Sequence, residues 1–259
     1  MTTTYTSYRL ITQDLTKSLE RVAARTDVKR ETEYYMSKIG DVKSVDDFMA
    51  DSRLYNYALK AHGLEDMAYA KAFIRKVLTE GIDNEDAFAR KLTDNRYSDL
   101  VKSLNFSAHG AAATSFDAAQ KGIVARYTRE TLEQDAGADN TGVRLALYFE
   151  RNAASIASPM AILADDALSQ VVRTVLQIPD EALAGDIDRM ADHIGKSIKI
   201  EDFKDPEKLG KFLERFTALW ELSNPSENYN PTSVLGSGSG YGLSTDLLLS
   251  INNLKLGGR

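Results

Sequence analysis

Apolar side chains recur every three or four residues along most of this chain, which is the spacing that places them on one face of an α-helix. In the first such segment, residues 7–25, the face carries Tyr8, Ile11 and Leu15. The same spacing predicts further helices over residues 28–39, 54–61, 66–80, 84–92, 94–104, 115–137 and 206–222. The pattern therefore predicts an all-α fold.

Residues that favour helix starts stand in front of several of these segments. Ser44 and Asp51 are suitable N-caps, and Asp205 is an N-cap followed by a proline at the first helical position. All five prolines lie at or beyond Pro159, so the first part of the chain lacks the residue that helix interiors exclude. The small, uncharged stretch at 105–114 has no periodicity and predicts a central loop.

An internal repeat divides the body of the chain. Residues 34–66 align without gaps on residues 148–180, at a constant offset of 114 (148 minus 34). The identical pairs are Tyr34/Tyr148, Ser44/Ser158, Ala50/Ala164, Asp51/Asp165, Leu54/Leu168 and Asp66/Asp180. Several of these are the expected N-caps, which a preserved helix-turn-helix skeleton would keep. We therefore predict two similar multi-helix units, residues 1–110 and 111–223, that arose by duplication.

The composition changes at residue 224. Prolines and a glycine- and serine-rich run at 236–242 predict a flexible linker within the tail, residues 224–259. Ser244 or Thr245 then caps a short amphipathic helix whose apolar face carries Leu247, Leu248, Ile251 and Leu254. A face that small is not stable alone, so we expect it to dock on the chain's own body or on a partner.

Composition and charge exclude several classes of function. The absence of cysteine excludes disulfide scaffolds, thiolate zinc sites and cysteine nucleophiles. The net charge is −6, and basic residues are scattered among carboxylates, which argues against a nucleic-acid partner. The first residues lack the basic and apolar regions of a Sec-type signal peptide, and no run approaches the roughly 18 apolar residues of a membrane span.

The chemistry-bearing residues form no recognisable site. The three histidines, His62, His109 and His193, are too far apart in sequence for a helical metal pair. The glycine run at 236–242 fits neither a dinucleotide-binding nor a phosphate-loop motif. We predict no catalytic residue, no cofactor and no metal. His109 in the expected central loop is the remaining candidate for a catalytic base, and it needs a partner that the sequence does not place.

Several strings resemble the domain-of-unknown-function family 1217. They are YTSYRLI at 5–11, RETEYY at 30–35, LKAHGL at 59–64, AKAFIRKVLTEG at 70–81, VRLALYFER at 143–151 and NLKLGG at 253–258. Members of that family occur in flagellated alphaproteobacteria, often within flagellar gene clusters. The resemblance implies a flagellar connection and brings no catalytic or binding residues with it.

Three functional hypotheses follow. The first is a non-enzymatic, flagellum-associated structural accessory or assembly factor, exported without a signal peptide, whose contacts with other proteins use Tyr8, Ile11, Leu15, Leu247, Leu248, Ile251 and Leu254. The second is a cytoplasmic helical binding module, such as an export chaperone or regulator, whose tail docks on its body. The third is an enzyme that uses His109 and nearby carboxylates in a cleft between the two units.

Overall fold

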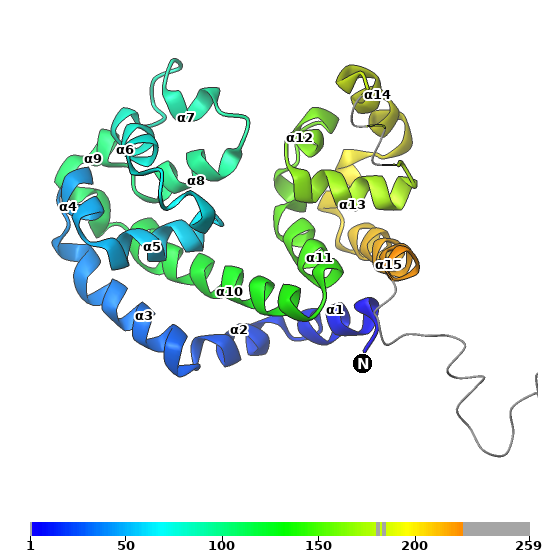
Figure 1. Cartoon of the computed structure of the whole chain (residues 1–259), viewed down its shortest axis with the longest axis horizontal. Coiled ribbons are helices and arrows are strands. Elements are labelled where there is room, and N and C mark those ends of the chain that lie inside the picture. Colours follow the sequence, from blue (N-terminus) through cyan, green and yellow to red (C-terminus); the bar gives the residue numbers. More distant parts are fainter. Residues whose placement is uncertain (1, 180–181, 183–184, 225–259) are drawn as a thin grey trace, which may run out of the picture.

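The computed structural model describes residues 2–179, 182 and 185–224, and every regular element in these ranges is a helix (Figure 1). The predicted all-α class is therefore confirmed. The predicted tail helix with Leu247, Leu248, Ile251 and Leu254 lies outside the described residues.

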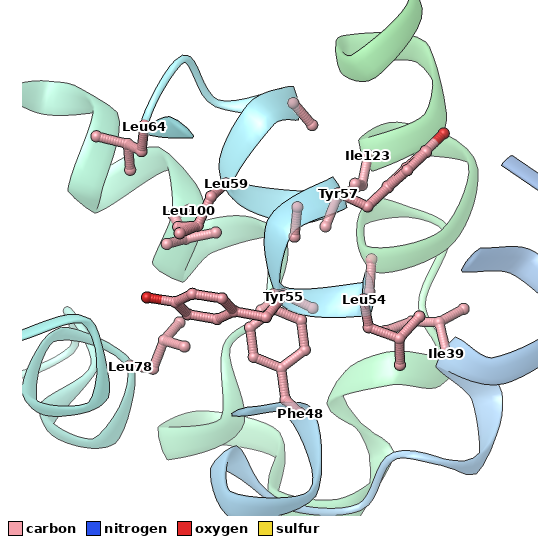
Figure 2. Close-up of a cluster of buried hydrophobic side chains, with 14 of the residues drawn as sticks. Ile39, Phe48, Leu54, Tyr55, Tyr57, Leu59, Leu64, Leu78, Leu100 and Ile123 are labelled. Atoms are coloured by element: carbon pink, nitrogen blue, oxygen red, sulfur yellow. The ribbon is translucent and has the colours of Figure 1, made fainter. Parts of the chain in front are cut away.

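The first lobe encloses its own hydrophobic core. Its elements are α2 (Leu15–Ala23), α3 (Thr26–Lys38), η1 (Ile39–Asp41), α4 (Val45–Ala50), α5 (Ser52–Ala61), η2 (Glu65–Met67), α6 (Lys71–Glu80), α7 (Phe88–Lys91), α8 (Asn95–Ser103), α9 (Phe106–His109) and η3 (Gly110–Ser115). Figure 2 shows the centre of this core, where Tyr55 lies edge-on to Phe48 with ring centroids 6.1 Å apart and Leu54 lies beside Ile39. Aromatic pairs in this arrangement stabilise a core beyond their buried area.

The second lobe has a separate core to which the start of the chain contributes. Its elements are α1 (Thr4–Thr12), α11 (Thr141–Asn152), η5 (Ala153–Ser155), α12 (Pro159–Leu163), α13 (Asp166–Leu176), α14 (Ile187–Ser197), η7 (Ile200–Lys204) and α15 (Pro206–Ser223). The π-turn η4 (Ala118–Gly122) leads into the long helix α10 (Ile123–Asp139), which packs against α2, α5 and α11. Figure 1 shows the two lobes standing apart on a shared base of α1, α2, α3 and α10.

The first predicted helix, residues 7–25, is in fact two helices. Asp14 leaves helical geometry (φ −141°) and its carboxylate accepts a hydrogen bond from Lys17 N at 3.0 Å, capping α2. The break lets α1 turn Tyr8 into the second core while Val22 of α2 enters the first. A single straight helix could not supply both cores.

The region around the predicted central loop also differs. Residues 105–114 are helical rather than a loop, because Asn105 caps α9 through Ala108 N at 3.2 Å and η3 follows directly. The helix predicted to begin at Ser115 begins with η4, and it continues past Gly137 because Asn140 N still bonds Ala136 O at 2.9 Å.

Elements of the two lobes recur at the predicted offset of 114 residues. The turns η1 and η5 obey it at both ends, and α4 and α5 match α12 and α13 in their starts. Tyr34 Oη donates to Asp51 Oδ2 at 2.7 Å, and Tyr148 Oη donates to Asp165 Oδ2 at the same distance. Duplication as the origin of this agreement stays a prediction, as do the unit boundaries.

Candidate functional site

A cleft of about 660 Å³ lies between the two lobes. The first lobe contributes the start of α8, and the second contributes one face of α11 and parts of α12 and α13. Figure 1 shows α8 on the side of the first lobe that faces α12 and α13. Because residues of both lobes line this cleft, we take it as the strongest candidate site among the cavities of the described residues.

The carboxylates around this cleft hold structural positions. Asp94 Oδ2 lies 2.8 Å from Arg96 Nη2, and Asp99 Oδ1 lies 2.8 Å from Lys102 Nζ. Asp165 caps α13 by accepting from Leu168 N at 2.9 Å. Because these groups are engaged in ion pairs and caps, their arrangement does not form the paired acid and base of a hydrolytic site.

The floor of the cleft is a narrower niche of about 80 Å³. Four guanidinium groups line it together with two carboxylates and a buried imidazole: Arg96, Arg126, Arg144, Arg151, Asp99, Glu130 and His62. Arg96 also donates to the backbone oxygen of Gly63. Gly63 has a positive φ of 67°, a conformation that favours glycine. The niche thus combines residues from α5, α8, α10 and α11.

Buried ion pairs beneath the niche join α10 to α11. The side chains of Glu130 and Glu133 are 3% and 1% exposed, and Arg151 Nη2 lies 3.0 Å and 2.9 Å from their Oε2 atoms. Arg129 Nε donates to Glu133 Oε1 at 2.8 Å. Burial raises the pKa of Glu133, while Arg151 and Arg129 oppose that rise. This network fixes α11 of the second lobe to α10, the helix that packs against both lobes.

His62 is a structural residue rather than a catalytic base. Its Nδ1 lies 2.8 Å from Ala58 O, and its Nε2 lies 3.0 Å from Ser103 Oγ. Burial lowers the pKa of His62 to about 4, and the positive charges of Arg126 and Arg151 act in the same direction. The ring is therefore neutral at physiological pH.

His109 lies outside the cleft. It is exposed at the end of α9, and its ring centroid is 4.7 Å from that of Phe116. Neither the cleft nor its niche includes it. The structure therefore does not bring His109 and the cleft carboxylates together, as the enzyme hypothesis required.

The predicted contact residues of the first helix are used within the molecule. Tyr8 is 5% exposed in the second core, Ile11 packs against both cores, and Leu15 packs against the first. Their contact with a partner stays a prediction, and it requires a state in which α1 is detached from the rest of the protein.

The two ends of the described chain meet at α1 and α15. Thr4 N donates to Glu221 Oε2 at 2.9 Å, and Asn140 Nδ2 donates to Thr4 Oγ1 at 2.9 Å. Figure 1 shows the start of α1 beside α15. Leu10 and Leu222 remain 59% and 79% exposed on these helices, so this end of the molecule also presents apolar side chains.

The sequence pattern does not indicate that the arginines of the niche lie together. Arg126, Arg129, Glu130 and Glu133 follow one another at helical spacings, which is a weak signal of an ordinary solvated face. Only the packing of α11 against α10 shows which of these charges are buried and which face the cleft.

Two features are absent from the described part of the chain. It contains no group of three or more His, Cys, Asp or Glu side chains arranged to hold a metal ion. Within the same residues, no helix has the length and apolar character required to cross a membrane.

The chain is similar to a family of unknown function and to a protein of known crystal structure. Residues 61–209 match the family described as protein of unknown function DUF1217. The crystal structure of protein AGR_C_984 from Agrobacterium tumefaciens is 66% identical, with a TM-score of 0.80 over 86% of this chain and 94% of that one. No curated protein matches significantly.

Proposed function

Because the chain belongs to the DUF1217 family, we propose that it is a non-enzymatic, flagellum-associated protein, a structural accessory or assembly factor that acts through contacts with other proteins. The resemblance to a family encoded in flagellar gene clusters motivates the flagellar part. The packing of α1 against α15 is the observation that carries the contact part.

Paired terminal helices are typical of flagellar axial and export-dependent proteins, in which they pack together in the assembly. Here the Thr- and Ser-rich residues 2–7 lead into α1, which closes on α15, the last helix of the described residues, through the Thr4 to Glu221 hydrogen bonds. Exchange of α1 for a partner helix would present Tyr8 and Ile11, which now fill the body. Leu247, Leu248, Ile251 and Leu254 of the tail would supply a second contact.

Co-purification from motile cells tests this proposal. A tagged full-length chain and a chain without residues 224–259 are purified in parallel, and basal bodies, culture supernatant and cytoplasm are probed. We expect flagellar components with the full chain and a clear loss of them without the tail. Normal motility after gene deletion, together with no association with basal bodies or supernatant, would contradict the proposal.

A cytoplasmic export chaperone or regulator is the second candidate. A groove of about 600 Å³ between α13 and α15 favours it, because Trp220 and Leu219 line this groove beside Asn224, where the tail departs. In that case the tail docks on the body and competes with a client. Secretion that depends on the flagellar export apparatus would exclude a solely cytoplasmic role.

A further inference from the structure

We infer that the niche at the floor of the inter-lobe cleft binds a carboxylate side chain of a partner's peptide segment, with Arg126 and Arg144 as its ligands. This inference is independent of the flagellar connection, since it rests on the charges and geometry between the lobes. It names the chemistry of a partner rather than its cellular location.

Two of the four niche arginines are already neutralised within the chain. Arg96 is held by Asp94 through two donors at 3.0 Å and 2.8 Å, and Arg151 is held by the two buried glutamates. Arg126 is exposed and takes part in no ion pair among the described residues. Arg144 is half-exposed, and its Nη2 lies 3.5 Å from Glu130 Oε1, a weak contact that leaves donors free.

The position of Arg144 is set by a glycine on the neighbouring helix. A Cβ atom built on Gly137 would lie 2.7 Å from Arg144 Cδ and 3.0 Å from Arg144 Cβ. The aliphatic part of Arg144 therefore lies directly on the backbone of α10, which restricts the guanidinium to the region of Glu130 and the niche. Gly137 is thus a positioning residue for this ligand.

Within the niche, the guanidinium groups of Arg126 and Arg144 lack a strong carboxylate partner among the described residues. The lining of the niche carries four guanidinium groups against two carboxylates, while the chain has a net charge of −6. Burial is the main cause of the lowered pKa of His62; the charges of Arg126 and Arg151 add to it, and that of Asp99 opposes it. The guanidinium groups of Arg126 and Arg144 are therefore complementary to a single negative group.

The size and surroundings of the niche select the ligand. A water occupies about 30 Å³, so a niche of about 80 Å³ holds a group the size of a carboxylate. The adjoining cleft of about 660 Å³ has space for a short peptide segment, and Asp94, Asp99, Asp165 and Asp166 line it. Asp94 and Asp99 are paired with Arg96 and Lys102. Asp165 and Asp166 have no cationic partner among the described residues, so they repel a polyanion such as a nucleotide and favour a peptide that places a basic residue beside its acidic one.

Peptide binding measured by fluorescence anisotropy tests the inference. The probe is a dye-labelled hexapeptide with a central Glu-Lys pair among Gly and Ser, and its Gln-Lys counterpart is the control. We expect saturable binding of the Glu peptide to the full chain and about tenfold weaker binding of the Gln peptide, because hydrogen bonds to a charged group are stronger.

Four variants of the full chain connect binding to the niche. Arg126→Ala and Arg144→Ala should each weaken binding about tenfold, and Gly137→Ala should do so without changing the net charge. Arg189→Ala removes an 88% exposed arginine of α14 and should leave the affinity unchanged. Circular dichroism checks that each variant is folded, and Arg126→Ala at an exposed position keeps the test valid if Gly137→Ala does not fold.

Four outcomes would overturn the inference. They are no saturable binding of the Glu peptide, equal binding of the Gln peptide, an equal loss with Arg189→Ala, and unchanged binding by Arg126→Ala and Arg144→Ala. Competition with free anions gives one more such outcome. If inorganic phosphate displaces the Glu peptide at lower concentrations than acetate does, the niche is a phosphate site and the inference is overturned.

Discussion

At the scale of single residues, His62 links protonation to folding. Its pKa is lowered from 6.5 to about 4 in the folded chain, so the unfolded chain binds more protons between these values. Stability therefore rises with pH across this window and falls as the pH drops from about 6.5 toward 4. The difference corresponds to roughly 3 kcal/mol at most.

We expect urea denaturation at several pH values to show this loss in the wild type and a shallower pH dependence in His62→Gln. Exposed His109 supplies the matched control, because His109→Gln should keep the wild-type slope. Parallel slopes for the wild type and His62→Gln would contradict the assignment of a neutral, buried imidazole.

Gly142 is a second residue with a specific structural role, because the Trp220 side chain lies close against its backbone. A Cβ atom there would lie 2.3 Å from Trp220 Cδ1, whereas a Cβ atom on Gly210 in α15 meets nothing within 4 Å. Gly142→Ala should therefore destabilise the chain by about 1–3 kcal/mol, and Gly210→Ala should stabilise it by about 0.5–1 kcal/mol. Unfolding followed by the fluorescence of the single tryptophan measures both changes. Equal effects of the two substitutions would show that the Trp220 contact is not rigid.

At the scale of elements, Tyr8 is the large buried side chain by which α1 joins the second core. Tyr8 is 5% exposed, whereas Tyr5 on the same helix is 37% exposed. Tyr8→Ala should cost about 3–5 kcal/mol, as large-to-small changes in cores do, and Tyr5→Ala much less.

Chemical denaturation of the two variants checks this prediction, and the dye ANS reports on the exposed second core. Strong ANS binding by Tyr8→Ala but not by Tyr5→Ala is the expected result. Similar stabilities of the two variants would mean that α1 does not contribute to the second core, and the proposed exchange of this helix would lose its basis.

At the scale of the whole molecule, the two cores are joined by α10 and its buried charges. Glu133→Ala removes the closest carboxylate partner of Arg129 and one of the two partners of Arg151, and breaking such a buried pair costs about 3–5 kcal/mol. Glu214→Ala on the exposed face of α15 is the control and should change stability by less than about 0.5 kcal/mol. Thermal and urea unfolding monitored by circular dichroism compare the two. A Glu133→Ala chain as stable as the control would show that the network is not needed to hold the lobes together.

The sequence predicts a helix start correctly where a side chain beside that start caps the helix. Ser44 accepts from Asp47 N at 3.1 Å, Asp51 from Leu54 N at 3.1 Å and Asp205 from Glu207 N at 2.9 Å, as their positions predict. Asp66 does not cap α6, which begins at Lys71 without a side-chain cap, and its repeat partner Asp180 lies outside the described residues. The predicted loop at 105–114 was wrong because small uncharged residues form helical turns when a cap and a core support them.

The sequence by itself determined the helical class, the helix starts that depend on a side-chain cap such as Ser44, Asp51 and Asp205, and the family, because periodicity, capping and shared strings are local properties of a chain. Tertiary structure alone decided that α1 belongs to the second core, that His109 is not among the residues lining the cleft, and that four arginines line one niche. These features depend on contacts between residues far apart in the chain, such as Thr4 with Glu221 and Arg96 with Gly63. Helical periodicity shows which face of a helix is buried, and only the packed structure shows against what.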